Sequence, residues 1–304
     1  MVNVVAAMKP LIHGLVKLAG LSQQTVEIEP GTVMDFWAPK ETKTAVNKKP
    51  NKPVVVFAHP FAGDAILMWF PQVLGLTSQY SVYVPDFIFF GGSTTSRPDR
   101  SAEFQAECLA RGLWKLGVEK CTVVGLSYGG MVGFKMAAMY PELVEALVAS
   151  CTVIEMTESV AHQSQKKLGI SQWSELLLPE TAEGVKFLFT ACWHKWPNWL
   201  PDFVYKHCLQ VLFSNRKEKA ELLEALIVRD EESTNITSYP QRIHLLWGDD
   251  DKIFNLDLAQ SMKERLGENA TLQWIENAGH LAQLERPSAF NNHLKRILSS
   301  TYNS

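Results

Sequence analysis

Short runs rich in β-branched residues alternate with segments of helical character, and this alternation constrains the fold most strongly. The runs occupy residues 54–58, 82–86, 121–125 and 144–149, and the pattern resumes at 242–248 and 270–275 before a closing helix at 286–298. Strands separated by helices predict an α/β fold with a mostly parallel central sheet flanked by helices. In such a sheet, functional groups gather at the carboxyl ends of the strands.

The alternation stops between residues 152 and 238, which we predict to be an inserted helical cap. The core would then consist of residues 1–151 and 239–304. The inserted segment is unusually aromatic, with three tryptophans between residues 193 and 199. These rings could form a small core of the insertion, and some could line an apolar cavity where it meets the sheet domain.

The composition favours a small-molecule partner. The formal net charge is −3 and no run of five like charges is present, so nothing indicates a nucleic-acid surface. Five widely spaced cysteines, several within apolar runs, favour reduced thiols and a cytoplasmic protein. The sequence carries no cofactor motif and no zinc or calcium spacing, so we expect neither a cofactor nor a metal. We expect a monomer or a weak dimer.

The N-terminal segment, residues 2–21, is apolar but repeatedly interrupted by polar residues and a proline. It is too broken for a membrane-spanning helix, and its apolar residues recur near helical spacing. Two interpretations stay open: a helix packed on the body of the protein, or a helix resting on a membrane surface. Residues 38–52, rich in Lys, Thr, Asn and Pro, are predicted to form an exposed loop.

The sequence Gly125-Leu-Ser127-Tyr-Gly129 lies between an apolar run and a segment of helical character. This is typical of a nucleophile elbow, a sharp strand-to-helix turn that exposes a serine hydroxyl. Glycine two positions on either side allows strand and helix to approach closely. Ser127 is therefore the candidate nucleophile.

A serine nucleophile requires an acid and a histidine after later strands. The run ending at Gly248 leads into three aspartates, residues 249–251, and the chemistry alone does not distinguish among them. The run ending near residue 275 leads into Asn277-Ala-Gly-His280, which makes His280 the candidate base.

Four motifs together resemble the α/β-hydrolase-fold superfamily, in particular its capped serine lipases and esterases. They are His59-Pro-Phe61-Ala-Gly63, the Asp86 to Ser93 segment, the elbow at Ser127, and the segment ending in His280. The resemblance covers nearly the whole chain, and residues 26–37 also look similar to plant hydrolases of this fold.

The resemblance implies a role for further residues. The family's acid follows the strand-end glycine by three positions and maps onto Asp251, which leaves Asp249 and Asp250 as solvated loop charges. The family's oxyanion hole maps onto the N–H groups of Phe61 and Tyr128. The family usually has glycine where this chain has Pro60, so the direction of the Phe61 N–H is a question for the structure.

These residues predict a serine hydrolase that cleaves a carboxylic ester of a small to medium apolar substrate through an acyl-enzyme. Leu126 stands where the family's carbon–carbon hydrolases commonly carry asparagine, and a serine at the elbow disfavours dehalogenase and epoxide hydrolase chemistry. A small-molecule receptor with slow turnover and a carbon–carbon hydrolase or lyase remain as alternatives.

Overall fold

The computed structural model describes residues 3–41, 50–197, 199–233 and 239–302. Its central sheet has the strand order β1-β2-β4-β3-β6-β7-β10-β11, with β5 paired to β2. The strands are β1 (Leu21–Glu29), β2 (Thr32–Pro39), β3 (Val54–Ala58), β4 (Ser81–Pro85), β5 (Thr94–Thr95), β6 (Cys121–Leu126), β7 (Val144–Ser150), β10 (Arg242–Gly248) and β11 (Ala270–Ile275). From β4 to β11 every pairing along this order is parallel. The predicted fold class is confirmed.

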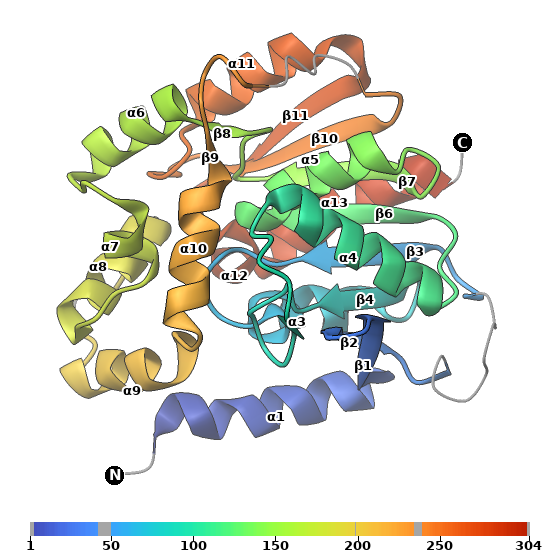
Figure 1. Cartoon of the computed structure of the whole chain (residues 1–304), viewed down its shortest axis with the longest axis horizontal. Coiled ribbons are helices and arrows are strands. Elements are labelled where there is room, and N and C mark those ends of the chain that lie inside the picture. Colours follow the sequence, from blue (N-terminus) through green and yellow to red (C-terminus); the bar gives the residue numbers. More distant parts are fainter. Residues whose placement is uncertain (1–2, 42–49, 198, 234–238, 303–304) are drawn as a thin grey trace.

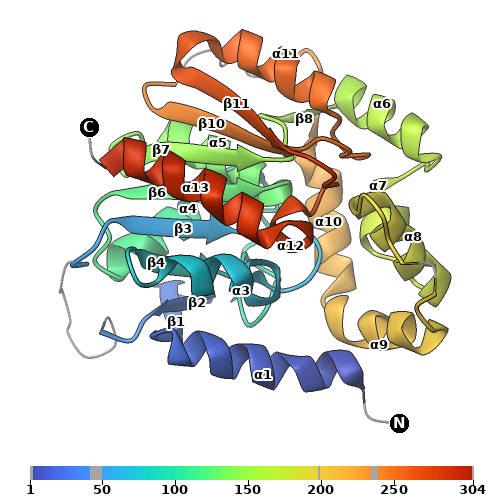
Figure 2. The ribbon, with the colours of Figure 1, turned by 180° about the vertical axis from the view of Figure 1, so that it is seen from behind.

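Helices cover both faces of the sheet (Figures 1 and 2). One face carries α4 (Ala102–Lys115) and α5 (Tyr128–Met139), and the other carries α3 (Ala65–Leu76) and α13 (Pro287–Tyr302). Helix α11 (Leu256–Leu266) packs against β10 and β11, and the short 3₁₀ turn η1 (Gly267–Asn269) connects α11 to β11. Every residue of β3 and β6 is buried, as expected for parallel strands with helices on both sides.

The hairpin of β1 and β2 was not predicted. In β1 only the terminal Leu21 and Ile28 are buried, while the residues between them are polar or partly exposed. The strand forms because it pairs antiparallel with β2, whose residues are almost all buried, with one irregularity between Glu27 and Glu29. Gly31 adopts a positive φ of 82° in the turn, a conformation that glycine accepts readily. The predicted loop at 38–52 begins within β2, and its residues 42–49 lie outside the described residues.

Between β7 and β10 the described residues form five helices, which lie beyond the carboxyl ends of the strands (Figure 1). They are α6 (Glu158–Leu168), α7 (Trp173–Leu177), α8 (Ala182–Cys192), α9 (Asp202–Leu212) and α10 (Arg216–Leu226). Two short strands, β8 (Met156–Thr157) and β9 (Ile227–Val228), pair in parallel where the chain enters and leaves this helical insertion. That the insertion is a separate cap domain with limits at 152 and 238 stays a prediction, and residues 234–238 lie outside the described residues.

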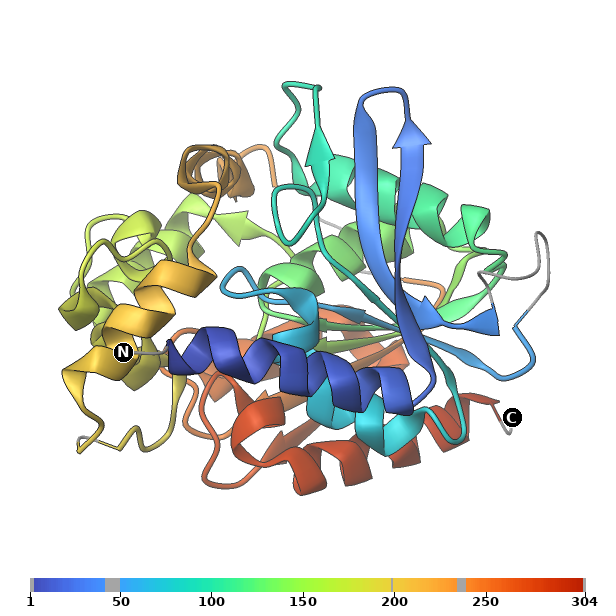
Figure 3. The same cartoon turned by 90° about the horizontal axis from the view of Figure 1, so that it is seen from below.

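Helix α1 (Val4–Leu18) lies along the outside of the molecule, against α3 and, near its own N-terminal end, against α9 of the insertion (Figure 3). The predicted amphipathic helix is therefore present. Within the described residues, no helix has the length and apolar character needed to cross a bilayer.

Candidate functional site

Ser127 forms the turn between β6 and α5, and its backbone is strained. Its φ is 53° and its ψ is −119°, a conformation that few residues other than glycine adopt. Three hydrogen bonds to the Ser127 carbonyl hold the turn: those from the N–H groups of Gly130 (2.8 Å) and Met131 (3.1 Å), and that from the Thr152 hydroxyl (2.6 Å). The strain is therefore imposed by the surrounding structure and points the Ser127 side chain out of the sheet edge.

Two glycines make the turn possible, as the sequence pattern predicts. A Cβ on Gly125 would collide with the backbone of Gly129, and a Cβ on Gly129 would collide with the backbone of Ala58. A side chain at Gly125 would therefore force β6 and α5 apart, and one at Gly129 would force α5 away from the end of β3. Thr152 was not predicted, because it lies after the following strand and only the fold brings its hydroxyl to the elbow.

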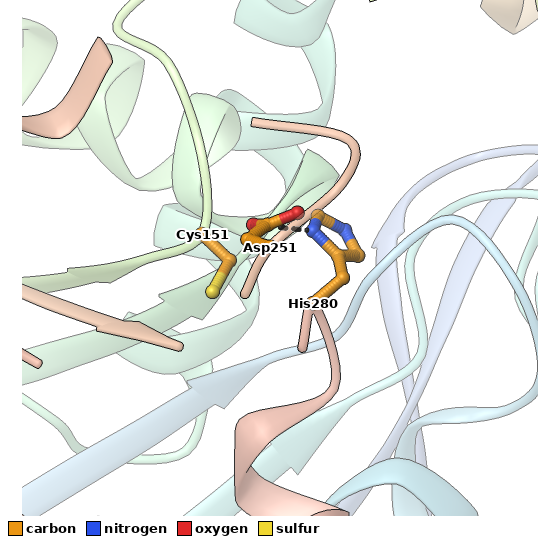
Figure 4. Close-up of side chains that lie close together, drawn as sticks. All are labelled: Cys151, Asp251 and His280. Carbon is orange, nitrogen blue, oxygen red and sulfur yellow. Dashed lines mark hydrogen bonds and ion pairs between the residues drawn. The ribbon is translucent and has the colours of Figure 1, made fainter. Parts of the chain in front are cut away.

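Asp251 and His280 come from the loops after β10 and β11, and their side chains lie next to each other (Figure 4). Oδ2 of Asp251 lies 2.9 Å from Nδ1 of His280, and the two side chains are 0% and 4% exposed. The other carboxylate oxygen, Oδ1, accepts the N–H groups of Ile253 (2.8 Å) and Phe254 (3.0 Å). Because the carboxylate accepts at Nδ1, the proton of the neutral ring lies there, and Nε2 keeps a free lone pair.

Cys151 lies beside this pair, and its sulfur, the Asp251 carboxylate and the His280 ring offer ligand atoms within 4.8 Å of one another (Figure 4). The thiol is fully buried, and burial raises the pKa of Cys151 well above its ordinary value. A protonated thiol is a poor metal ligand, and three N–H donors already occupy the carboxylate. The cluster therefore has the chemistry of an acid–base pair.

The two other aspartates of this loop are exposed or partly exposed, as expected from the sequence, and each also makes a hydrogen bond. Asp249 accepts the N–H of Ala278 at 3.2 Å, and Asp250 lies 2.9 Å from Nδ1 of His194 in the helical insertion. Neither side chain reaches His280. Of the three candidates, the structure brings only Asp251 to the imidazole.

Hydrogen bonds in the loop after β3 fix the direction of the Phe61 N–H. His59 is buried, and burial lowers its pKa to about 4, so the ring is neutral at physiological pH. Its Nε2 accepts the N–H of Phe87 at 3.0 Å, so the proton lies on Nδ1, which donates to the Pro60 carbonyl at 2.7 Å.

A trans peptide directs its C=O and its N–H to opposite sides, and the described residues contain no cis peptide. Because His59 holds the Pro60 carbonyl, the Phe61 N–H points away from His59. Among the described residues, neither this N–H nor that of Tyr128 has a hydrogen-bond acceptor. Proline at position 60 thus leaves both predicted oxyanion donors available.

An apolar cavity opens above Ser127 and His280. Its lining combines the loop after β3 with side chains of the helical insertion, including Trp173, Phe189 and Phe213. No lysine, arginine, aspartate or glutamate of the described chain lines it. Both interpretations of the aromatic residues of the insertion apply. Some line this cavity, and the Trp196 ring packs against the rings of Trp193 and Phe189, of which Phe189 also lines the cavity.

Ser127 and His280 share this cavity, but no hydrogen bond between the hydroxyl and the ring is present in the described structure. Catalytic hydrogen bonds of this kind are often long without substrate and shorten when it binds. The arrangement can therefore support nucleophilic attack by the hydroxyl with Nε2 as the base.

Glu285, in α12 (Ala282–Glu285), bridges the His280 loop and the insertion. Its two carboxylate oxygens accept the N–H groups of Gly279 (2.7 Å) and His194 (2.9 Å). Burial raises the pKa of Glu285, and these two N–H bonds oppose that shift. A Cβ on Gly279 would lie 2.7 Å from the His194 nitrogen, so the two segments pack backbone against backbone. The sequence carried no sign of this role, since the contacts depend on the fold.

We expect Glu285→Gln to lower kcat/KM for the ester hydrolysis predicted from the sequence by about tenfold, because one hydrogen bond to a charged acceptor is lost. The amide can replace only one of the two acceptors, so the Gly279 N–H or the His194 N–H is left unpaired. The control is Glu276→Gln, an exposed carboxylate after β11, which should leave kcat/KM and its pH profile unchanged. Equal pH–rate profiles for both variants and the wild type would contradict the positioning role of Glu285.

Comparison with known proteins supports the observed fold. A family model for the alpha/beta hydrolase fold matches residues 53–183. "Putative carbamate hydrolase RutD" of Stutzerimonas stutzeri is 34% identical over 101 residues, or 33% of this chain and 38% of that protein. The same-named protein of Serratia proteamaculans is matched over 49% of its length, so the chain spans less than half of these two relatives. 3-Oxoadipate enol-lactonase 2 of Acinetobacter baylyi is 24% identical over 82% of this chain and 89% of that protein.

Solved structures share the fold over almost the whole chain. A bacterial membrane phospholipase A superposes with a TM-score of 0.77 at 22% identity, covering 99% of this chain and 92% of that one. A "putative lipase (lip1)" of Acinetobacter baumannii gives 0.79 at 20% identity, covering 97% and 96%. The 2-hydroxy-6-oxo-6-phenylhexa-2,4-dienoate hydrolase of a Rhodococcus species gives 0.70 at 18%, covering 93% and 99%. The relatives named here are bacterial, and the similarity to plant hydrolases stays a prediction. The matched family model and the shared architecture show that the chain has the α/β-hydrolase fold.

Proposed function

We propose that the protein is a serine hydrolase that cleaves carboxylic esters with an uncharged, apolar acyl or alcohol part. One observation carries the proposal: a strained serine and a buried His–Asp pair open together into a cavity with no charged lining residue. The names of the relatives, which include a carbamate hydrolase and an enol-lactonase, support hydrolysis at a carbonyl carbon.

In this mechanism the Ser127 hydroxyl attacks the ester carbonyl while Nε2 of His280 takes its proton. Asp251 holds the ring by Nδ1 and stabilises the imidazolium that forms. The N–H groups of Phe61 and Tyr128 bind the oxyanion, each contributing about 3 kcal/mol in the transition state. His280 then protonates the leaving alcohol, and water, activated by the same ring, hydrolyses the acyl-enzyme.

The cavity lining favours ester hydrolysis over the carbon–carbon hydrolase alternative. The dienoate named for the related Rhodococcus structure is a carboxylate, and a buried carboxylate needs a cation or several hydrogen-bond donors. The described cavity offers no lysine or arginine for that purpose. An apolar acyl chain, by contrast, gains about 0.8 kcal/mol for each buried methylene group.

Two esters of matched chain length test this specificity: p-nitrophenyl hexanoate and the mono-p-nitrophenyl ester of adipic acid. We expect kcat/KM to be about 100-fold or more higher for the hexanoate, because the adipate would bury an unpaired carboxylate. Equal or faster hydrolysis of the adipate ester would contradict the proposed substrate class. A single stoichiometric burst without further turnover would favour the receptor alternative.

A further inference from the structure

Helix α1 presents a continuous apolar stripe on its outward side. Its exposed members are Val4, Met8, Leu11, Leu15 and Leu18, with Leu11 65% and Leu18 86% exposed. They are spaced by alternating steps of four and three residues, so they form one stripe along the full length of the helix. Leucine and methionine rarely gather at this exposure on a surface that faces only water.

The inward side of α1 attaches the helix to the rest of the protein. Ile12 and Val16 are buried there. Lys9 pairs with Asp64, the N-cap of α3, at 2.7 Å, and the Val4 N–H donates to the His207 ring of α9 at 3.2 Å. The helix is thus anchored to the core and to the insertion, and none of these anchors uses a side chain of the outward stripe.

We propose that α1 docks on the surface of an anionic lipid bilayer, lying parallel to it with the outward stripe in the headgroup–acyl boundary. At 15 residues, the helix is about 22 Å long, which suits an interfacial rather than a spanning helix. The proposal does not depend on the proposed function.

Positive charge near the C-terminal end of α1 favours docking on an anionic lipid surface. The first acidic residue of the sequence is Glu27, although the whole chain carries a net charge of −3. The Lys40 ammonium donates to the Lys17 carbonyl at 2.6 Å, and Lys40 and Lys52 border one surface hollow together with a single acid, Glu41. Lysines beside an exposed apolar helix face each add about 1 kcal/mol of attraction to an anionic leaflet.

The residues beside the stripe favour a bilayer over a second copy of the chain. The stripe has the four-and-three spacing of the a and d positions of a heptad repeat, and Ala7 and Gly14 lie at positions that flank it. In paired helices these flanking positions commonly carry charged residues that set the register and the choice of partner. Uncharged small flanks widen the apolar face instead. Near the N-terminal end of α1, His207 accepts the Val4 N–H, and the ring centroid of the partly exposed Phe203 lies 5.5 Å from that of His207. Phe203 therefore adds an aromatic group close to this end of the helix.

Co-sedimentation of the full chain with vesicles tests this proposal. We expect binding to vesicles of phosphatidylcholine and phosphatidylserine that weakens as the ionic strength rises, and little binding to phosphatidylcholine alone. The triple variant Met8→Ser, Leu11→Ser, Leu18→Ser should lower the partition coefficient by about tenfold or more, since these apolar groups would enter the boundary. The variant Lys17→Gln, Lys40→Gln should remove most of the preference for phosphatidylserine.

The matched control is Met139→Ser, Trp274→Ser, which removes exposed apolar side chains from α5 and β11. It should bind vesicles like the wild type. Absence of wild-type binding, or equal binding by the triple variant, would overturn the proposal, as would a concentration-dependent dimer that the triple variant abolishes. Repeating the assay with Ser127→Ala, which should bind normally, keeps this result separate from catalysis.

Discussion

Replacing Ser127 with alanine is expected to lower kcat for ester hydrolysis by about 10⁴-fold or more, the loss typical of removing a nucleophile that acts together with its base. The change removes one oxygen atom and keeps the Cβ, so the backbone bonds to the Ser127 carbonyl should persist. The measurement is steady-state hydrolysis of p-nitrophenyl hexanoate by purified variants of equal thermal stability.

The matched control for this change is Ser288→Ala, an exposed serine in α13. It should hydrolyse the ester at the wild-type rate. A fall of less than tenfold in Ser127→Ala would refute the elbow interpretation. If His280→Ala lost activity while Ser127→Ala kept it, the lyase alternative would be favoured, since the ring would then act as a base without acyl transfer.

Asp251→Asn is expected to lower kcat by about 10³-fold to 10⁴-fold near neutral pH. The asparagine oxygen would remain with the two backbone N–H groups that now bind Oδ1, which turns the amide nitrogen toward His280. Two donors cannot face each other, so the ring proton would move to Nε2. The base would then have no free lone pair for the serine proton.

Asp249→Asn and Asp250→Asn provide controls of identical chemistry in the same loop. Asp249 contacts the Ala278 N–H and Asp250 contacts His194, so each change should lower kcat by less than tenfold. Profiles of kcat/KM against pH for the three variants supply the comparison. Equal losses in all three would remove the assignment of Asp251 as the acid.

Much of the fold could be predicted because its central strands are buried on both faces and therefore read as short β-branched runs. The runs at 54–58 and 242–248 coincide with β3 and β10. The β1–β2 hairpin escaped prediction because the buried positions of β1 lie near its ends and its middle is polar. The short pair β8–β9 was missed for a similar reason, since two residues carry no periodicity.

The candidate site could be predicted as far as its residue types follow strand ends. Ser127, Asp251 and His280 each follow the end of a predicted strand, so their order was visible in the chain. Contacts that depend on tertiary structure were not. The Thr152 bond to the elbow and the bridge through Glu285 join residues that the sequence gives no reason to connect.

The Phe61 N–H shows the same limit. Its direction depends on which nitrogen of the buried His59 carries the proton, and a hydrogen bond from Phe87 decides that. From the sequence, Pro60 looked like an obstacle to an oxyanion hole. In the structure its carbonyl is the group that His59 holds, and the donor on the other side of the same peptide stays free.

The central claim, that Ser127 is an activated nucleophile, is tested most directly by intact-protein mass spectrometry after incubation with a fluorophosphonate, followed by mapping of the labelled peptide. The account predicts one covalent adduct per chain, located on Ser127 and absent from Ser127→Ala. No adduct on the wild type, or an adduct that persists in Ser127→Ala, would contradict it.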